Sequence, residues 1–233
     1  MKLLVINPNS STSMTEGLVS ALRDLEHPGL VLEYFNAPRF SPPSINDFTT
    51  SILSAAHTFN MLNGPNLTAT DDGSWDAYLV ACFSDHPLVG MLREHTHKPV
   101  LGIFEASIMQ ALALGKPFGI VTTGKYWEEA LTAGVRRIFG SADLGGSFVG
   151  VQSTGMSAAE LHEVSQDVVA DRIAVATSQT VARGARTVIL GCAGMSGMED
   201  AARKGRSGVD IRIIDAARSG VTTLEGLVRA QKQ

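Results

Sequence analysis

Leu3-Leu4-Val5-Ile6-Asn7-Pro8-Asn9-Ser10-Ser11 opens the chain with four apolar residues and a polar turn. A short apolar run that is bounded by turn residues is typical of a buried strand in a parallel sheet. Three further runs of this kind occur, and helical patterns lie between them. The alternation predicts an α/β protein whose mainly parallel sheets are flanked by helices. The four predicted strands are 3–6, 78–81, 118–121 and 187–190.

Weaker strand patterns and the helices complete this prediction. Apolar runs with less clear boundaries make further strand candidates of 30–35, 100–104 and 211–214. The 3.6-residue periodicity predicts helices over 15–25, 45–62, 87–95, 128–139, 158–183 and 222–230. Capping boxes, in which a serine and a glutamate three residues later satisfy free amides, are predicted at Ser13, Ser157 and Ser196. After Cys82, either Ser84 or Asp85 is expected to cap the next helix, with Pro87 in its first turn.

The order of the strand ends indicates an internal duplication. Cys82 ends a predicted strand 73 residues after Asn9, which follows the first strand. Cys192 ends another predicted strand 69 residues after Thr123, which follows the strand at 118–121. We therefore expect two pseudo-symmetric α/β lobes, residues 1–99 with 215–233 and residues 100–214. The active site is expected in the cleft between these lobes, with one cysteine on each wall.

Composition and charge narrow the class of protein. The 233 residues are 44% hydrophobic, which is enough for one large domain or two lobes with real cores. The net charge is −4 and no run of Lys or Arg is present, so no nucleic-acid partner is expected. Pro8 interrupts the opening too soon for a signal peptide, and no apolar stretch approaches the ~20 residues of a membrane span. We expect a soluble, cytoplasmic protein that binds a small molecule and no membrane.

The two cysteines are the strongest candidates for chemistry. In a reducing compartment both thiols are expected to be free. Each ends a predicted strand, where ligands bind in open α/β sheets. A helix start after each cysteine would lower the thiol pKa from about 8.5 and suit it to acid–base work. A free cysteine is also often a small buried hydrophobe. The corresponding positions of Cys82 and Cys192 in two lobes favour the catalytic reading.

Small polar residues at the same strand ends are candidate ligand contacts. The turn at 8–12 and the segment Thr122-Thr123-Gly124 offer hydroxyls and amides, although both could simply cap helices. No phosphate-binding loop or metal-ligand spacing occurs among the six histidines, so neither metal nor cofactor is expected. His86, four residues after Cys82, makes a thiol hydrolase conceivable, but that chemistry leaves Cys192 without a role.

Five segments occur in order along the chain: Val5-Ile6-Asn7-Pro8-Asn9-Ser10-Ser11, Cys82-Phe83-Ser84-Asp85, Gly102-Ile103-Phe104-Glu105-Ala106, Ile120-Val121-Thr122-Thr123 and Leu190-Gly191-Cys192-Ala193-Gly194-Met195. Together they resemble the Asp/Glu/hydantoin racemase superfamily, and most of all its hydantoin and allantoin racemase branch. The turn Ser84-Asp85-His86-Pro87-Leu88 resembles fungal members linked to allantoin catabolism. It differs from the Gly-Asp-Pro-Gly of bacterial hydantoin racemases.

The resemblance implies a cofactor-independent isomerase that forms homo-oligomers. It also implies that Cys82 and Cys192 are the paired catalytic acid and base of a two-base proton transfer. The implied substrate is a 5-substituted hydantoin or allantoin. Arylmalonate decarboxylases of the superfamily keep only the second cysteine, so the presence of both favours racemisation. The implied substrate contacts are Asn9, Ser10, Ser11, Phe40, Phe83, Ser84, Asp85, Glu105, Thr122, Thr123, Ala193 and Gly194.

Other functions stay open at this point. An aspartate or glutamate racemase would need cationic contacts for two charged groups, and Arg39 is the only nearby candidate. A thiol-dependent decarboxylase or hydrolase, or a binding protein that kept the pocket without catalysis, is a further alternative. Exchange of the substrate α-proton with solvent distinguishes the racemase from the binding protein.

Overall fold

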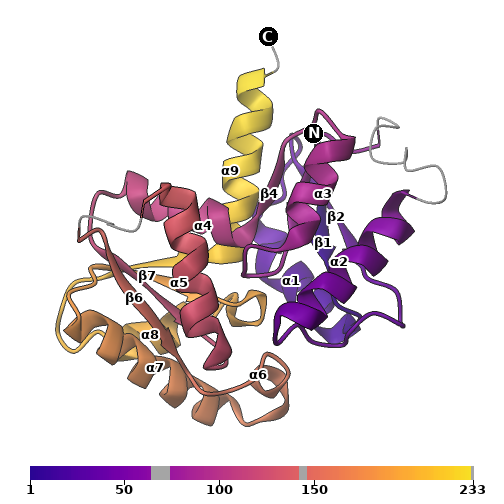
Figure 1. Cartoon of the computed structure of the whole chain (residues 1–233). Coiled ribbons are helices and arrows are strands. Elements are labelled where there is room, and N and C mark those ends of the chain that lie inside the picture. The colour runs from indigo at the N-terminus through magenta and orange to yellow at the C-terminus, as the bar shows by residue number, and fades with distance from the viewer. Residues whose placement is uncertain (64–73, 142–145, 232–233) are drawn as a thin grey trace. The chain divides into compact units, whose positions relative to one another are not determined.

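The computed structural model describes residues 1–63, 74–141 and 146–231 (Figure 1). Its strands form two four-stranded sheets, and every neighbouring pair of strands is parallel. The chain divides into unit 1, Met1–Ile103 with Ala217–Gln233, and unit 2, Phe104–Ala216. The predicted α/β class with mainly parallel sheets and flanking helices is confirmed.

Unit 1 is built on a sheet of strand order β2-β1-β3-β4. All six residues of β1 except Lys2 are buried, as expected for a strand that has neighbours on both sides and helices on both faces. The strands are β1 (Lys2–Asn7), β2 (Val31–Asn36), β3 (Ala77–Val80) and β4 (Val100–Gly102). The helices are α1 (Thr12–Leu22), the 3-10 turn η1 (Arg23–Leu25), α2 (Phe48–Asn63), α3 (Pro87–His95) and α9 (Ala216–Gln231).

Unit 2 repeats this plan with the strand order β6-β5-β7-β8. In each unit the strands therefore run second, first, third and fourth across the sheet, which is the pattern that an internal duplication produces. The strands are β5 (Phe118–Thr122), β6 (Phe148–Ser153), β7 (Thr187–Gly191) and β8 (Arg212–Asp215). The helices are α4 (Ile103–Ala113), α5 (Tyr126–Phe139), α6 (Glu160–Glu163), α7 (Gln166–Ala182), the 3-10 turn η4 (Ala193–Met195) and α8 (Glu199–Lys204).

Alternate residues of the central strands pack against different helices. In unit 1, Tyr78 and Val80 join residues of α2 and α3 in one core cluster. On the other face, Leu79 lies so close to Gly220 of α9 that a Cβ there would come within 2.5 Å of a Leu79 methyl. In unit 2, Leu190 packs with α7 and α8. The helices thus cover both faces of the sheet in unit 1, and burial of these side chains supplies most of the stabilisation.

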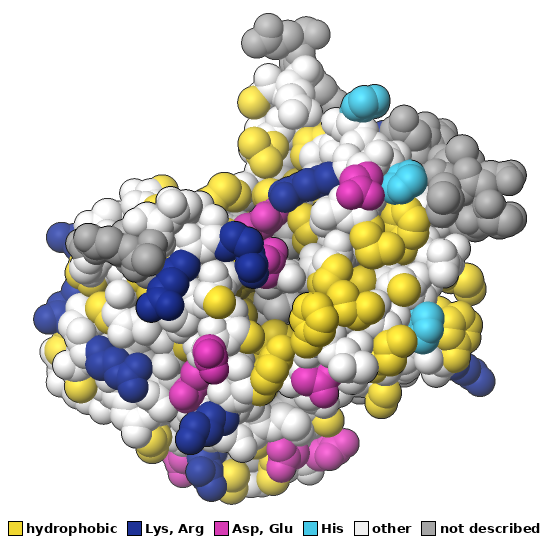
Figure 2. Space-filling model, viewed as in Figure 1, with side chains coloured by type: hydrophobic (Ala, Val, Ile, Leu, Met, Phe, Trp, Pro, Cys, Tyr) yellow, Lys and Arg dark blue, Asp and Glu magenta, His cyan; other side chains and the backbone are white. Residues whose placement is uncertain are grey.

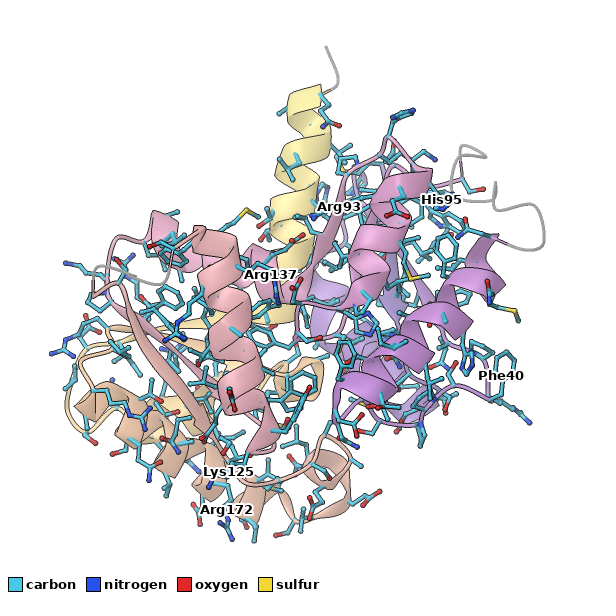
Figure 3. The ribbon with its side chains drawn as sticks, viewed as in Figure 1. Phe40, Arg93, His95, Lys125, Arg137 and Arg172 are labelled. Carbon is cyan, nitrogen blue, oxygen red and sulfur yellow. The ribbon has the colours of Figure 1, made fainter. Side chains whose placement is uncertain are left out.

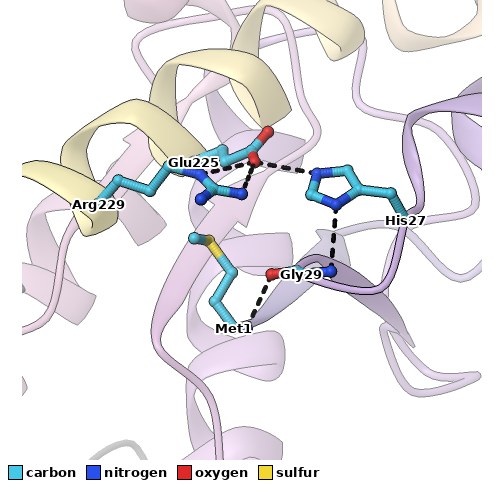
Figure 4. A network of polar contacts seen from close by, with 5 residues as sticks. All are labelled: Met1, His27, Gly29, Glu225 and Arg229. Carbon is cyan, nitrogen blue, oxygen red and sulfur yellow. Dashed lines mark hydrogen bonds and ion pairs between the residues drawn. The ribbon is translucent and has the colours of Figure 1, made fainter.

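The last helix is tied back to the start of the chain within unit 1 (Figure 4). The Glu225 carboxylate accepts hydrogen bonds from Arg229 at 2.7 Å and from the His27 ring at 3.1 Å. His27 Nδ1 accepts from the Gly29 amide, so Nε2 carries the proton that reaches Glu225. The Met1 ammonium donates to the Gly29 carbonyl at 2.9 Å. These exposed contacts add to the packing of α9 in unit 1, where Val221, Leu224 and Val228 are buried, whereas β8 belongs to the sheet of unit 2.

Several element boundaries differ from the sequence prediction. The pattern at 100–104 was predicted as one strand, but β4 ends at Gly102 and α4 begins at once. α4 is apolar on most sides and largely buried, so periodicity alone does not distinguish it from a strand. β6 was missed because most of its residues are only half-buried at a sheet edge. The predicted helix at 158–183 is interrupted between α6 and α7. The predicted second lobe began at residue 100, but β4 pairs with β3, so residues 100–102 lie in the sheet of unit 1. The boundaries of the predicted lobes otherwise stay a prediction.

The predicted helix caps are partly right. Ser157 and Glu160 form the reciprocal capping box, with bonds of 2.7 and 3.3 Å. The box at Ser13 is wrong, because α1 begins earlier, at Thr12. The box at Ser196 is wrong because its hydroxyl donates to Asp215 instead. In the described ranges, no helix combines the length and apolar character that crossing a membrane requires.

Candidate active site

Cys82 lies at the carboxyl end of β3, beside the turn that follows β1. Ile6 pairs with Val80, and the Ala81 amide continues the ladder by donating to the Ile6 carbonyl at 2.8 Å. The register therefore places Cys82 next to Pro8. Its sulfur lies 3.5 Å from Ser84 Oγ, and the residue is partly exposed. A partly exposed thiol at the carboxyl edge of a parallel sheet is positioned to meet a ligand.

The turn after β1 is held from within by two asparagines. Asn7 is 1% exposed, and its Nδ2 lies within 3.1 Å of Asn9 Oδ1, the Ser11 carbonyl and Thr15 Oγ1. Asn9 Oδ1 also accepts from the Ser11 amide at 2.9 Å. The Asn9 side chain is buried, so its amide serves the turn itself. Sequence reasoning overlooked Asn7 as the hub of this network, although an asparagine ending a buried strand was visible.

Ser10 and Ser11 complete the turn. The Ser10 hydroxyl donates to the Ser41 carbonyl at 2.9 Å, and the Ser10 amide donates to Pro42. Ser11 Oγ lies 2.9 Å from Ser13 Oγ. Both serines stay partly exposed, so their remaining hydrogen-bonding capacity faces outward from a rigid turn.

His86, not Ser84 or Asp85, caps α3. Its Nδ1 accepts from the Leu88 amide at 3.3 Å, and its Nε2 lies 2.9 Å from Ser54 Oγ. Nδ1 is therefore the acceptor and Nε2 carries the proton. Burial lowers the pKa of His86 to about 4, which keeps the ring neutral. Both ring nitrogens have partners other than a thiol, which argues against a Cys82–His86 nucleophilic pair.

We predict that His86 makes unit 1 sensitive to mild acid. Its pKa is near 6.5 when unfolded and about 4 when folded, so stability is complete above pH 6.5 and falls as the pH drops toward 4. The expected loss is roughly 3 kcal/mol over that window. Urea denaturation of the wild type and of His86→Gln at pH 7 and pH 4.5 measures it. Glutamine keeps a donor and an acceptor without titrating, so equal pH dependence in the two proteins would contradict the assignment.

Cys192 occupies the equivalent place in unit 2, at the carboxyl end of β7. Thr122 of β5 pairs with Gly191, and its hydroxyl donates to the Gly191 carbonyl at 2.8 Å. One residue further along, Thr123 lies beside Cys192. In unit 1, Pro8 lies beside Cys82 in the same way. Thr123 is 4% exposed, and its carbonyl accepts from the Gly155 amide at 3.1 Å. The predicted residues Thr122, Thr123 and Cys192 are thus brought together by one strand pair.

The electrostatics of Cys192 differ from the expectation. Burial raises the pKa of the Cys192 thiol to about 11, although backbone hydrogen bonds from Gly194 and Met195 oppose the rise. The prediction of a lowered pKa is wrong for Cys192 because desolvation outweighs the two backbone hydrogen bonds. In addition, only the three-residue turn η4 follows Cys192 directly, and α8 begins seven residues later. Cys192 is therefore a neutral thiol at neutral pH.

A buried carboxylate holds the loop after Cys192. Asp215, the last residue of β8, is 6% exposed and accepts from the Ser196 hydroxyl at 2.5 Å and from the Gly197 amide at 3.0 Å. Sequence analysis did not identify Asp215, although an acidic residue at the end of the apolar run 211–214 was the available signal. Asp215 fixes the far end of the loop whose amides contact the Cys192 sulfur.

The remaining predicted contacts lie in varied surroundings. Phe40 is 70% exposed at the outer surface of unit 1 (Figure 3), with its ring 4.9 Å from that of His57. Glu105 is half-buried in the first turn of α4. In the part of the chain that the structure describes, no group of three or more His, Cys, Asp or Glu side chains gathers as a metal site would. Of the residues flanking the cysteines, Phe83 and Ser84 are buried, Asp85 is exposed, and Ala193 and Gly194 are partly exposed.

Known proteins that are similar to this chain include racemases and uncharacterized fungal proteins. An uncharacterized protein of Schizosaccharomyces pombe is 39% identical, covering 98% of this chain and 92% of that protein. A hydantoin racemase of Paenarthrobacter aurescens is 28% identical, covering 98% and 91%. The crystal structure of allantoin racemase from Pseudomonas fluorescens is 26% identical, with a TM-score of 0.84, and covers 99% of this chain and 92% of that one.

The similarity to one family extends over nearly the whole sequence. Residues 3–224 match the family described as Asp/Glu/Hydantoin racemase. This range includes both sheets, both cysteines and all five segments on which the resemblance rested. The chain therefore belongs to the Asp/Glu/hydantoin racemase family.

Proposed function

We propose that this protein is a cofactor-independent racemase in which Cys82 and Cys192 move a proton across one carbon. The observation that carries the proposal is the equivalence of the two thiols. Cys82 follows β3 and lies beside Pro8, the residue after β1. Cys192 follows β7 and lies beside Thr123, the residue after β5. The two sheets have the same strand order. Family membership supports the same chemistry.

The proposed reaction needs one thiolate and one thiol. The thiolate removes the proton from the carbon α to a ring carbonyl, and the bonding electrons pass to the carbonyl oxygen as an enolate. The other thiol then donates its proton to the opposite face of the same carbon, so the product has inverted configuration. The two sulfurs exchange protonation states in each turnover. Proton transfer between sulfur and solvent restores the starting form.

The environment of Cys192 supports different roles for the two cysteines in the resting protein, one as the proton donor and the other as the base. With a pKa of about 11, Cys192 supplies the thiol at neutral pH, so the proposed reaction assigns the first proton abstraction to Cys82. The amides of Gly194 and Met195 that contact the Cys192 sulfur stabilise its anion when the reverse reaction requires it. The turn at 8–11 and Thr123 are the proposed contacts for the substrate ring.

We propose 5-substituted hydantoins or allantoin as the substrate class. The support is that relatives named as hydantoin racemases and allantoin racemases align with nearly the whole chain. In such rings, the carbonyl and the flanking nitrogen already acidify the α-hydrogen, so the proposed chemistry requires no cofactor. Two free thiols also agree with action in a reducing compartment, which we propose is the cytoplasm.

Proton exchange in D₂O tests the proposal directly. Single enantiomers of 5-substituted hydantoins, allantoin, aspartate and glutamate are incubated with the protein and followed by NMR and optical rotation. We expect deuterium incorporation together with racemisation for a hydantoin or allantoin, and neither for the double variant Cys82→Ala, Cys192→Ala. Exchange restricted to aspartate or glutamate would contradict the substrate class. No exchange with any compound would contradict the racemase itself.

A further inference from the structure

Helix α2 has the reverse of the usual polarity. Surface helices normally bury an apolar stripe and expose a polar face. In α2, four of the six buried residues are polar, namely Ser51, Ser54, Thr58 and Asn63. Four large hydrophobic side chains of the helix are exposed: Phe48, Ile52, Leu53 and Met61 have exposed fractions of 69%, 42%, 44% and 59%. The polar residues Thr49 and Asn60 are exposed between them. Figure 2 shows hydrophobic side chains gathered on the face of unit 1 where Figure 1 places α2 and α3.

The buried polar face of α2 forms hydrogen bonds within unit 1. Ser54 bonds to the His86 ring, and Thr58 Oγ1 donates to the Pro8 carbonyl in the turn after β1. The inner side of α2 therefore holds the two segments that border Cys82. The apolar outer side does not contribute to that core, and its burial needs another surface.

The apolar residues on the outer side of α2, together with Phe40 and His57, are called the α2 patch: Phe40, Phe48, Ile52, Leu53, His57 and Met61. Residues four apart on a helix are neighbours, which links Phe48 to Ile52, and Leu53 through His57 to Met61. Phe40 joins by its ring contact with His57. The hydrophobic members expose roughly 500 Å² of apolar surface, near the upper limit for a typical monomer.

We propose that the α2 patch is an interface with a second copy of this chain, packed two-fold about an axis between Ile52 and Leu53. Antiparallel pairing about that axis places Ile52 opposite Leu53 and Phe48 opposite the Phe40–His57 pair of the other copy. Each copy thus provides both halves of the contact, as a two-fold interface requires. With a polar rim, the patch approaches the about 800 Å² per partner of a standard interface.

The charges around the patch fit this occupant. Residues 48–63 contain no Lys, Arg, Asp or Glu, so two copies of the helix meet without like-charge repulsion. The exposed charges at the margin have opposite sign: Arg39 precedes Phe40, and Asp47 precedes Phe48. The proposed pairing brings Asp47 of each copy toward Arg39 of the other. A membrane surface fits less well, because helices that lie on membranes carry Lys and Arg on their second face, whereas that face of α2 is buried.

Light scattering and cross-linking of the full chain test the interface. We expect wild-type protein to have at least twice the mass of one chain at micromolar concentration. Ile52→Glu should at least halve that mass and raise the dissociation constant roughly 30-fold or more. The control Val175→Glu changes a 57% exposed valine on α7 and should leave the mass unchanged. A monomeric wild type, or an Ile52→Glu protein that keeps the full mass, would overturn the proposal.

A disulfide test covers the case in which a charge at position 52 disturbs folding. In a chain carrying Cys82→Ser and Cys192→Ser, Ile52→Cys should form a cross-linked dimer on mild oxidation, since the axis passes beside it. Val175→Cys in the same background should stay uncross-linked. Equal cross-linking at both positions, or none at position 52, would overturn the two-fold packing.

Discussion

Replacing Cys82 by serine is expected to abolish racemisation while leaving proton exchange in one enantiomer. The proposed mechanism places the two sulfurs on opposite faces of the reacting carbon, so each abstracts the proton from one enantiomer only. Serine keeps the size and hydrogen-bonding capacity of the side chain, but its hydroxyl does not ionise at working pH. Loss of an acid–base group typically costs 10²–10⁴-fold in rate, so we expect a fall in racemisation of about 10³-fold or more.

Cys192→Ser should give the mirror-image result. In Cys82→Ser, the enantiomer whose proton faces Cys192 should still exchange in D₂O with retention of configuration, at a rate that rises with pH because Cys192 is mostly a thiol at neutral pH. In Cys192→Ser, the other enantiomer should do so. The two variants serve as controls for each other, and circular dichroism checks that both are folded. Racemisation near the wild-type rate in either variant, or exchange of the same enantiomer in both, would rule out the two-base assignment and favour a one-thiol reaction.

The second large effect concerns the ionisation of Cys192. In Cys82→Ser, where Cys192 is the remaining cysteine, alkylation by iodoacetamide should rise about tenfold per pH unit from pH 7 to pH 10. The reason is that only the thiolate reacts, and burial raises the thiol pKa to about 11. Four units below that value, about one thiol in 10⁴ is ionised. The whole interval should therefore change the rate about 1000-fold.

Glutathione, a small exposed thiol, is the control for this measurement. Its rate should level off near the ordinary cysteine pKa of about 8.5, while that of Cys192 keeps rising. Circular dichroism at pH 10 checks that the protein stays folded. A plateau for Cys192 below pH 9 would show that the amides of Gly194 and Met195 outweigh burial, and Cys192 would then be able to act as the resting base.

Local sequence patterns were enough to predict the fold class. The runs at 3–6, 78–81, 118–121 and 187–190 are almost entirely apolar because their strands have neighbours on both sides and are buried. Such strands leave a signal in the chain itself. β6 (Phe148–Ser153) gives no such signal, because it is an edge strand whose residues are mostly half-buried. Its apolar and polar residues alternate too weakly to distinguish it from a loop.

The position of the candidate catalytic residues was also readable, but their surroundings were not. Both cysteines could be assigned to strand ends because an apolar run stops there. The pairing that sets Thr123 beside Cys192 depends on the register of β5 with β7. Likewise, the burial of His86 against Ser54 depends on α2, which begins 38 residues earlier in the chain.

The sequence by itself thus determined the alternation of strands and helices, the family, and the two thiols at equivalent strand ends, since each of these rests on neighbouring residues. Only the tertiary structure decided the raised pKa of Cys192, the role of Asp215 and the outward-facing apolar side of α2. Desolvation and hydrogen bonding depend on which distant segments surround a side chain. That arrangement is a property of the packed chain and has no counterpart in any short stretch of it.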